Sequence, residues 1–408
     1  MGQVWPLQGG LSAIVGLGNA PRESCLGAMG LHWQRRAWEG EAGIPLLLLA
    51  RGWSPCVRSV LLKILAFTCV KNEGPFLLEW IAYNRLIGVT DFLVFSNDCE
   101  DGSNVLLDRL AGHGVVRHLP HSAAPGKSVQ WQALQTVARD RLTAGFDWAM
   151  FADVDEFPMI HAGQHRLDDA IAVVPPDADA IAMPWRLFGA SGHVQFEDSP
   201  VTAQFLRSAP ADLYHPIAGR YIKTLFRPAR FQKPGVHRPK RRPTGPVPVW
   251  YDGAGARLPD DFAGRDSQIA LPTLTVGRGV IELNHYSLRS VESFIVKTAR
   301  GLANRRVKTI DLSYWVERNF NSVENTAITH WSAALAAETA ALRALPGVEA
   351  LHQQGCDWHR QRSAALIRTE EGYRLYCDCL HAADSAALPR RLALHLYAVF
   401  AELRAQGA

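Results

Sequence analysis

Strand-like and helix-like patterns alternate along residues 62–152, and this alternation constrains the fold more than any other feature of the chain. Four apolar runs bounded by turn signals are typical of buried strands: 62–70, 91–96, 115–119 and 148–152. Three segments between them have helical spacing: 76–86, 103–110 and 127–142. Strands that alternate with helices predict parallel pairing through right-handed crossovers. We therefore expect an α/β fold with a mixed, mostly parallel sheet flanked by helices.

The rest of the chain is less regular. Residues 1–60 are Gly-rich without a clear period, which predicts a loosely ordered extension or a segment that is not translated at all. The alternation continues through 61–184 and is lost in 185–330, although 178–183 and 281–286 still have the character of strands. Helical patterns follow at 288–305, 314–345 and 382–405, so we expect a helical C-terminal extension over 331–408.

Composition narrows the class of protein. The chain has 408 residues, 48% of them hydrophobic, and a net charge of +4, so it can bury a large core and carries no charge block that would favour nucleic acid. Seven cysteines without a Cys-x-x-Cys pair argue against a disulfide scaffold or a structural zinc site. No apolar span is long enough to cross a membrane. We expect a cytoplasmic protein, with peripheral contact to the inner face of the membrane left open.

Two carboxylates, Asp153 and Asp155, follow the strand at 148–152 directly. On an extended chain, side chains two residues apart point to the same side. Open α/β sheets bind ligands at the carboxyl ends of their strands. Repulsion between two neighbouring carboxylates is relieved by a divalent cation, and Mg²⁺ and Mn²⁺ prefer carboxylate oxygen. The pair therefore predicts a metal site.

Polar residues after other predicted strands are candidates for the same crevice. Asn72 and Glu73 end the first strand and Asp98 follows the second, where each has an ordinary turn or capping role as the alternative. Further candidates are cations and an imidazole: Lys127 at a helix start, Lys223 in an apolar run, His285 after a strand, and Lys297, Arg300 and Arg305 near one helix. The cations could neutralise a diphosphate or simply face water.

Several of these segments together resemble the bacterial glycosyltransferases related to families 2 and 92. The resemblance covers about residues 62–330 and is carried by Cys69-Val-Lys-Asn-Glu-Gly-Pro-Phe76, Phe95-Ser-Asn-Asp98, Asp153-Val-Asp-Glu-Phe157, Gly235-Val-His-Arg-Pro239 and Leu283-Asn-His-Tyr286, among others. It implies the GT-A (Rossmann-like) fold. On that basis 61–184 would be the nucleotide-sugar-binding half and 185–330 the acceptor-binding, catalytic half.

The resemblance also implies a reaction. A sugar would move from a nucleotide-diphosphate donor, usually a uridine one, to a hydroxyl of a glycan, lipid-linked or polysaccharide acceptor, with Mn²⁺ or Mg²⁺ at the diphosphate. Asp153, Asp155 and His285 would bind the metal; Asn72, Glu73 and Asp98 would hold the nucleoside; and Lys127, Lys223 and Arg305 are further donor-binding candidates. If the reaction inverts configuration it needs a base. We prefer Glu197 and Asp198 for that role, with Glu282 as second choice.

Two other functions remain open at this point. A phosphotransferase with an aspartyl nucleophile also uses Asp-x-Asp, but on its first strand and with a Thr where this chain has Phe157. A nucleotide- or sugar-binding protein without turnover is the other alternative.

Overall fold

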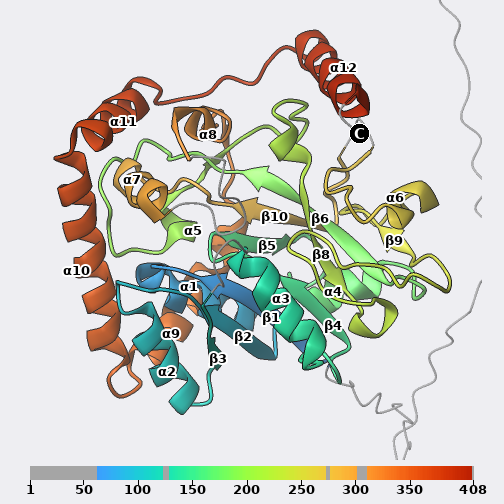
Figure 1. The fold of residues 1–408 in the computed structure, drawn as a ribbon, viewed down its shortest axis with the longest axis horizontal. Coiled ribbons are helices and arrows are strands. Elements are labelled where there is room, and N and C mark those ends of the chain that lie inside the picture. Colours follow the sequence, from blue (N-terminus) through green and yellow to red (C-terminus); the bar gives the residue numbers. More distant parts are fainter. Residues whose placement is uncertain (1–61, 123–127, 273–275, 301–309, 407–408) are drawn as a thin grey trace, which may run out of the picture. The chain divides into compact units, whose positions relative to one another are not determined.

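The computed structural model describes residues 62–122, 128–272, 276–300 and 310–406. Residues Val60–Ala408 form one compact unit (Figure 1), which contains all of 61–184, 185–330 and 331–408. The predicted extension over 1–60 lies outside the described residues.

A nine-stranded sheet organises this unit. Its main path runs β3-β2-β1-β4-β8-β6-β10-β5, and β9 pairs with β6 beside that path. The first four strands in chain order are β1 (Ile64–Val70), β2 (Asp91–Ser96), β3 (Arg117–Pro120) and β4 (Trp148–Phe151). The other five are β5 (Glu156–Ile160), β6 (Ala180–Leu187), β8 (Ile222–Phe226), β9 (Trp250–Tyr251) and β10 (Ile281–His285). A separate two-stranded sheet joins β7 (Arg207–Ser208) and β11 (Val323–Glu324).

The four strands predicted from the alternation are parallel neighbours. β1 pairs in parallel with β2 and β4, and β2 with β3. The antiparallel pairs all involve later strands: β8 runs against β4 and β6, and β5 runs against β10. The mixed, mostly parallel sheet is therefore confirmed.

Alternating side chains of the central strands divide the core between the two faces of the sheet. In β1, Ile64 and Ala66 pack into one buried cluster, and Leu65 and Phe67 pack into another. The first cluster includes apolar residues of α1 (Gly74–Leu86), α2 (Ser103–Gly112), α4 (Leu167–Val173) and α9 (Ser332–Arg343). The second includes those of α3 (Val129–Arg139) and α6 (Asp260–Gly264). Because both faces are covered, these strands are apolar throughout rather than alternating with polar residues.

Helices dominate the end of the chain. α10 (Val348–Ile367) contacts α1, α2 and α7 (Val291–Arg300), and α11 (Glu370–His381) packs on α7. Figure 1 shows α10 running past this group, with α12 (Arg390–Gln406) beyond α11. The remaining short elements are α5 (Val201–Gln204), α8 (Leu312–Val316), η1 (Ile217–Arg220), η2 (Pro228–Arg230) and η3 (Ala327–Trp331).

The helix predicted over 314–345 is wrong as a single element. It is divided into α8, β11, η3 and α9, because the chain turns back at 319–326 to pair β11 with β7. No helix in the described parts of the chain is both long and apolar enough to cross a membrane. The five cysteines within those parts are all free.

Candidate active site at the carboxyl edge of the sheet

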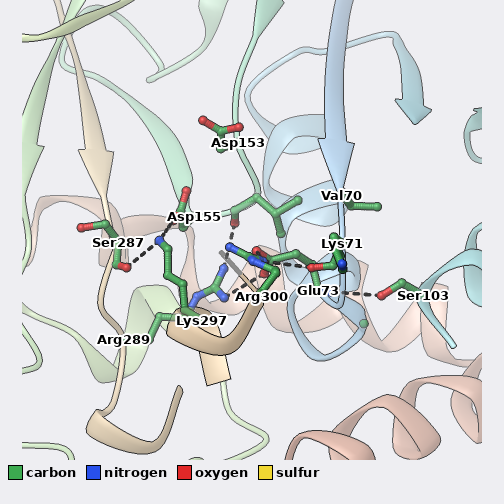
Figure 2. Close-up of polar contacts among 12 residues, drawn as sticks. Val70, Lys71, Glu73, Ser103, Asp153, Asp155, Ser287, Arg289, Lys297 and Arg300 are labelled. Carbon is green, nitrogen blue, oxygen red and sulfur yellow. Dashed lines mark hydrogen bonds and ion pairs between the residues drawn. The ribbon is translucent and has the colours of Figure 1, made fainter. Parts of the chain in front are cut away.

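Charged side chains from three strand ends and one helix meet at one edge of the sheet. β1 leads into Asn72 and Glu73, β4 into Asp153 and Asp155, and β10 ends at His285. α7 adds Lys297 and Arg300, and Figure 2 shows these two with Glu73, Asp153 and Asp155 near the end of β1. Parallel strands present their carboxyl ends on the same edge, which is why segments so far apart in sequence converge here.

Asp155 is the centre of this arrangement. Its carboxylate is buried, accepts a hydrogen bond from Lys297 Nζ at 2.7 Å, and lies 3.7 Å from His285 Nε2. Burial alone raises the pKa of Asp155, but the positive charge of Lys297 outweighs it and holds that pKa well below its usual range. Burial lowers the pKa of His285 well below its usual value, so its ring is neutral at pH 7. A carboxylate thus faces a neutral imidazole.

Asp153 is directed elsewhere. One of its carboxylate oxygens accepts from Gln130 Nε2 at 3.1 Å and the other from Lys223 Nζ at 2.8 Å. The strand ends at Phe151, and residues 153–156 form a turn closed by the Glu156 N–H on the Asp153 carbonyl. The expectation that Asp153 and Asp155 share one side of an extended chain is therefore wrong, and the two carboxylates lie apart in Figure 2.

Glu73 lies between two arginines. Its carboxylate pairs with Arg289 at 2.9 Å and with Arg300. Burial raises the pKa of Glu73, but Arg300 and Arg289 outweigh that effect and lower it below its usual value. Arg300 also donates to the carbonyl of Lys71, which fixes α7 to the loop after β1 (Figure 2). Glu73 therefore holds the cationic side of the site in place, which differs from the predicted contact with a nucleoside.

A second buried pair lies behind Asp153. Lys223 of β8 is fully buried and also reaches Glu156 Oε2 at 3.2 Å. Burial, together with the charges of Asp153 and Asp155, raises the pKa of Glu156 to about 8, although Lys223 opposes this. Glu156 N–H and carboxylate both bond to the backbone of Asp153, so this pair fixes the turn that carries the site.

The loops after β1 and β2 are tied together by their own polar groups. Asn72, at a left-handed φ of 55°, accepts the N–H of Glu100 on its side-chain oxygen at 2.7 Å. Asp101 accepts the N–H of Gly74 at 2.8 Å and Ser103 Oγ accepts that of Glu73 at 3.0 Å, so the second loop caps α1. Asp98, also at a positive φ, is exposed. Asn72 lines the site, whereas the role predicted for Asp98 stays a prediction.

The candidates for the base lie outside this cluster. Glu197 is exposed, and Asp198 is engaged by Arg343, His352 and Gln353. Burial raises the pKa of Asp198, but the hydrogen bond and charge of His352, with those of Arg343, lower it strongly. The structure thus gives no support for Asp198 as a proton acceptor at Asp155.

Glu282, the second choice, is enclosed by Arg186, Arg278 and His161. Two of the predicted donor-binding cations, Lys127 and Arg305, lie outside the described residues.

The space left at this edge is small. A cavity of about 20 Å³ is lined by Asn72, Glu73, Ser287, Arg289, Lys297 and Arg300, among others. That is room for about one water molecule. A pocket for a drug-sized ligand is usually about 300–1,000 Å³. The cavity as it stands is therefore too small to hold a nucleotide sugar.

Sequence reasoning missed two residues of the cavity wall. Arg289 follows β10 by four residues and has a left-handed φ of 59°, a strained conformation that is enriched at functional sites. Its position shortly after an apolar strand is the sequence signal that could have identified Arg289 as a site residue. His359 reaches the cavity from the middle of α10, which lies within the helical extension predicted over 331–408, although the sequence pattern did not single out this residue.

One part of the chain matches a known family. Residues 67–252 match glycosyltransferase family 92, a range from β1 to just beyond β9 that includes Glu73, Asp155 and Lys223 but ends before His285. Those residues are similar to glycosyltransferase family 92. The predicted resemblance to family 92 is thereby confirmed, over a shorter range than 62–330.

Similar proteins of this family come from plants. A family 92 protein of Oryza sativa subsp. japonica is 27% identical over 34% of this chain and 23% of its own length. Another, from Ricinus communis, is 31% identical over 26% of this chain and 18% of its own length. The chain thus spans less than a quarter of the length of these relatives. They give no support for the expected bacterial origin.

Solved structures share the architecture only in part. Glucosyl-3-phosphoglycerate synthase from Mycobacterium tuberculosis, in complex with Mn²⁺ and UDP, covers 30% of this chain and 44% of its own at 15% identity, with a TM-score of 0.22. TarS of S. aureus covers 75% of this chain and 55% of its own at 11% identity, with a TM-score of 0.30. Both TM-scores are low, so the family assignment rests on the sequence match.

Proposed function

We propose that this protein is a metal-dependent glycosyltransferase that moves a sugar from a nucleotide-diphosphate donor, with uridine as the first choice, to a hydroxyl acceptor. The observation that carries the proposal is the ionised, buried Asp155 facing neutral His285, with Lys297 and Arg300 beside it, in a chain whose residues 67–252 match family 92. The location at the carboxyl edge of the sheet, where α/β folds bind nucleotides, supports the same reading.

The residues present fit a divalent cation. Asp155 Oδ1 and His285 Nε2 lie 3.7 Å apart, a separation that two ligands of one ion can have when each bond is about 2.1 Å. His285 Nδ1 is buried and has no partner among the described residues. Oxygen and imidazole nitrogen suit Mn²⁺. A bound ion would supply Lewis acidity to the departing diphosphate.

Asp153 is a weaker candidate ligand than predicted. Both of its oxygens have partners within the protein, Gln130 and the buried Lys223. We propose that Asp155 and His285 bind the metal and that Asp153 and Lys223 position the turn between them.

The cations of the site suit the diphosphate. Lys297 and Arg300 lie on the last turns of α7, and Arg289 lies beside them. Each now pairs with a carboxylate, and charge-assisted hydrogen bonds of the same kind form with phosphate oxygens. When the sugar leaves, negative charge develops on the diphosphate, and cations fixed in a buried site stabilise that charge.

A screen of donors tests the proposal. UDP-, GDP- and dTDP-sugars are added with and without Mn²⁺, and thermal protection and sugar release are measured. Ligand binding raises the melting temperature by mass action, so we expect metal-dependent protection by one nucleotide class. Asp155→Asn should reduce the rate of sugar release by about 100-fold or more while the protein stays folded.

The control is Asp168→Asn, at an exposed position in the first turn of α4 that does not belong to the charged cluster. Protection without any sugar release would favour a binding protein without turnover. Transfer of phosphate to an aspartate would favour the phosphotransferase. The expected cytoplasmic location stays a prediction.

A further inference from the structure

A second hollow lies between α10 and the loop after β2. Its volume is about 470 Å³, within the range usual for small-molecule sites, whereas the cavity at Lys297 holds about 20 Å³. Six polar or aromatic side chains line it: Asp101, Gln353, Gln354, Asp357, Trp358 and Gln361. We call this hollow the α10 groove.

The lining of the α10 groove favours a neutral, hydroxyl-rich ligand. Its charged lining residues, Asp101 and Asp357, are both acidic, and although Arg360 pairs with Asp357 at 2.9 Å, no cation among the described residues lines the groove to attract phosphates or other anions. An apolar ligand would cover amide groups without replacing their hydrogen bonds, which costs free energy. Hydroxyl groups can donate to carboxylates and can both donate to and accept from glutamine amides. The flat indole of Trp358 offers a surface for the C–H face of a sugar ring.

The polar groups of the groove are partly fixed and partly free. Asp101 is held by the N–H of Gly74 and by Ser103, and the Gln353 amide donates to Asp198 and Glu349. By contrast, the side chains at 354, 358 and 361 have no hydrogen bond within the described residues. The fixed groups are already ordered, which lowers the entropic cost of binding a ligand. The free groups remain available as hydrogen-bond donors and acceptors.

The groove adjoins the candidate active site. Trp358 lines the groove and the next residue, His359, lines the cavity at Lys297, so one turn of α10 serves both. On the other side, Asp101 lines the groove and caps α1 at Gly74, next to Glu73. A saccharide held in the groove would thus lie across one turn of α10 from the cavity at Lys297.

We propose that the α10 groove binds a neutral saccharide and holds the acceptor of the transfer. The binding of saccharide depends only on the groove, whereas its role as acceptor rests on the proposed function. A glycan acceptor of several sugar units needs contacts away from the reacting hydroxyl, and the groove supplies them without any cation.

Titration calorimetry with neutral disaccharides tests this inference. Lactose, cellobiose, maltose and gentiobiose are titrated separately into the full chain, without nucleotide or metal. We expect saturable binding of at least one of them. Trp358→Ala should weaken that binding by about tenfold or more, the loss expected when a buried aromatic anchor is removed. Gln361→Ala, at an exposed position where misfolding is not a concern, should weaken it by a smaller factor.

Trp131→Ala is the matched control, because Trp131 is an indole 39% exposed on α3 that does not line the groove. It should bind like the wild type. The inference is overturned if none of the four disaccharides binds, or if both groove variants bind them as the wild type does. Metal-dependent binding of UDP is measured on the same samples. If UDP shows no metal-dependent binding while a disaccharide still binds, the proposed function is contradicted and the inference about the groove is retained.

Discussion

At the scale of single residues, the site is a set of carboxylates each matched by a cation. Lys297 holds Asp155, Lys223 holds Asp153, and the two arginines hold Glu73. A buried charge without a partner costs several kcal/mol, so these pairs are required for the folded state. The same cations are the groups that can bind a diphosphate once they exchange partners.

Lys297→Ala should weaken the binding of UDP by about tenfold or more, because a charge-assisted hydrogen bond contributes about 1.5–3 kcal/mol. Calorimetric titration in the presence of Mn²⁺ measures this. Lys63→Ala is the control, since Lys63 lies exposed before the amino end of β1 at the opposite edge of the sheet. Equal affinity of the Lys297 variant and the wild type would remove Lys297 from the donor site.

Glu282 gives a prediction for acid stability. Burial raises its pKa, but the His161 hydrogen bond and the charges of Arg186 and Arg278 outweigh it and lower the pKa to about 2. A lowered carboxyl pKa stabilises the fold above the unfolded value of about 4.3, and that contribution is lost as pH falls from about 5 towards 2. It amounts to on the order of 3 kcal/mol.

Urea unfolding between about pH 6 and pH 2.5 tests this effect in the wild type and in Glu282→Gln. The difference in unfolding free energy between the two proteins should shrink as the pH falls. A difference that is constant over this range would show that Glu282 titrates normally in the folded protein.

At the scale of elements, sequence patterns predicted what depends on local periodicity. The first four parallel strands and the helices between them follow from short apolar runs and turn signals, and α1 and β2 lie within two residues of their predicted bounds. The turn at 153–156 was not predicted, because four residues after a strand carry no period. Its geometry separates the two aspartates that the sequence places together.

Long-range contacts set the rest of the site. Arg289 meets Glu73 from a position 216 residues away, and Arg300 meets it from 227 residues away. The local sequence around a charged residue does not show which strand end that residue will face in the folded protein. Asp198 illustrates the same limit, because its partners Arg343 and His352 lie on α9 and α10, 145 and 154 residues further along the chain.

The close approach after β6 gives a prediction about one element. A Cβ on Gly189 would clash with the Asn321 side chain and lie 2.7 Å from the Phe320 carbonyl, so the segment at 319–321 lies directly on this glycine. Gly189→Ala should lower the free energy of unfolding by about 1–3 kcal/mol. Gly112→Ala is the control, because a Cβ there meets nothing within 4 Å. Equal stability of the two variants, measured by urea unfolding, would contradict this packing.

At the scale of the whole molecule, the charges of the site nearly cancel. Three carboxylates (Glu73, Asp153 and Asp155) meet four cations (Lys223, Arg289, Lys297 and Arg300), and the fourth carboxyl, Glu156, has its pKa raised to about 8. A divalent cation entering alone would add to the excess of positive charge, and a diphosphate alone would leave excess negative charge. Because the charges of the two oppose each other, each should raise the affinity of the site for the other.

Calorimetric titration of UDP with and without Mn²⁺, on the wild type and on Asp155→Asn, tests this coupling most directly. We predict that Mn²⁺ increases the affinity of the wild type for UDP by about tenfold or more, a coupling of about 1.4 kcal/mol, and that the variant loses most of this increase. UDP binding that is unaffected by Mn²⁺ in the wild type, or equally enhanced in the variant, would contradict a metal and donor site built around Asp155.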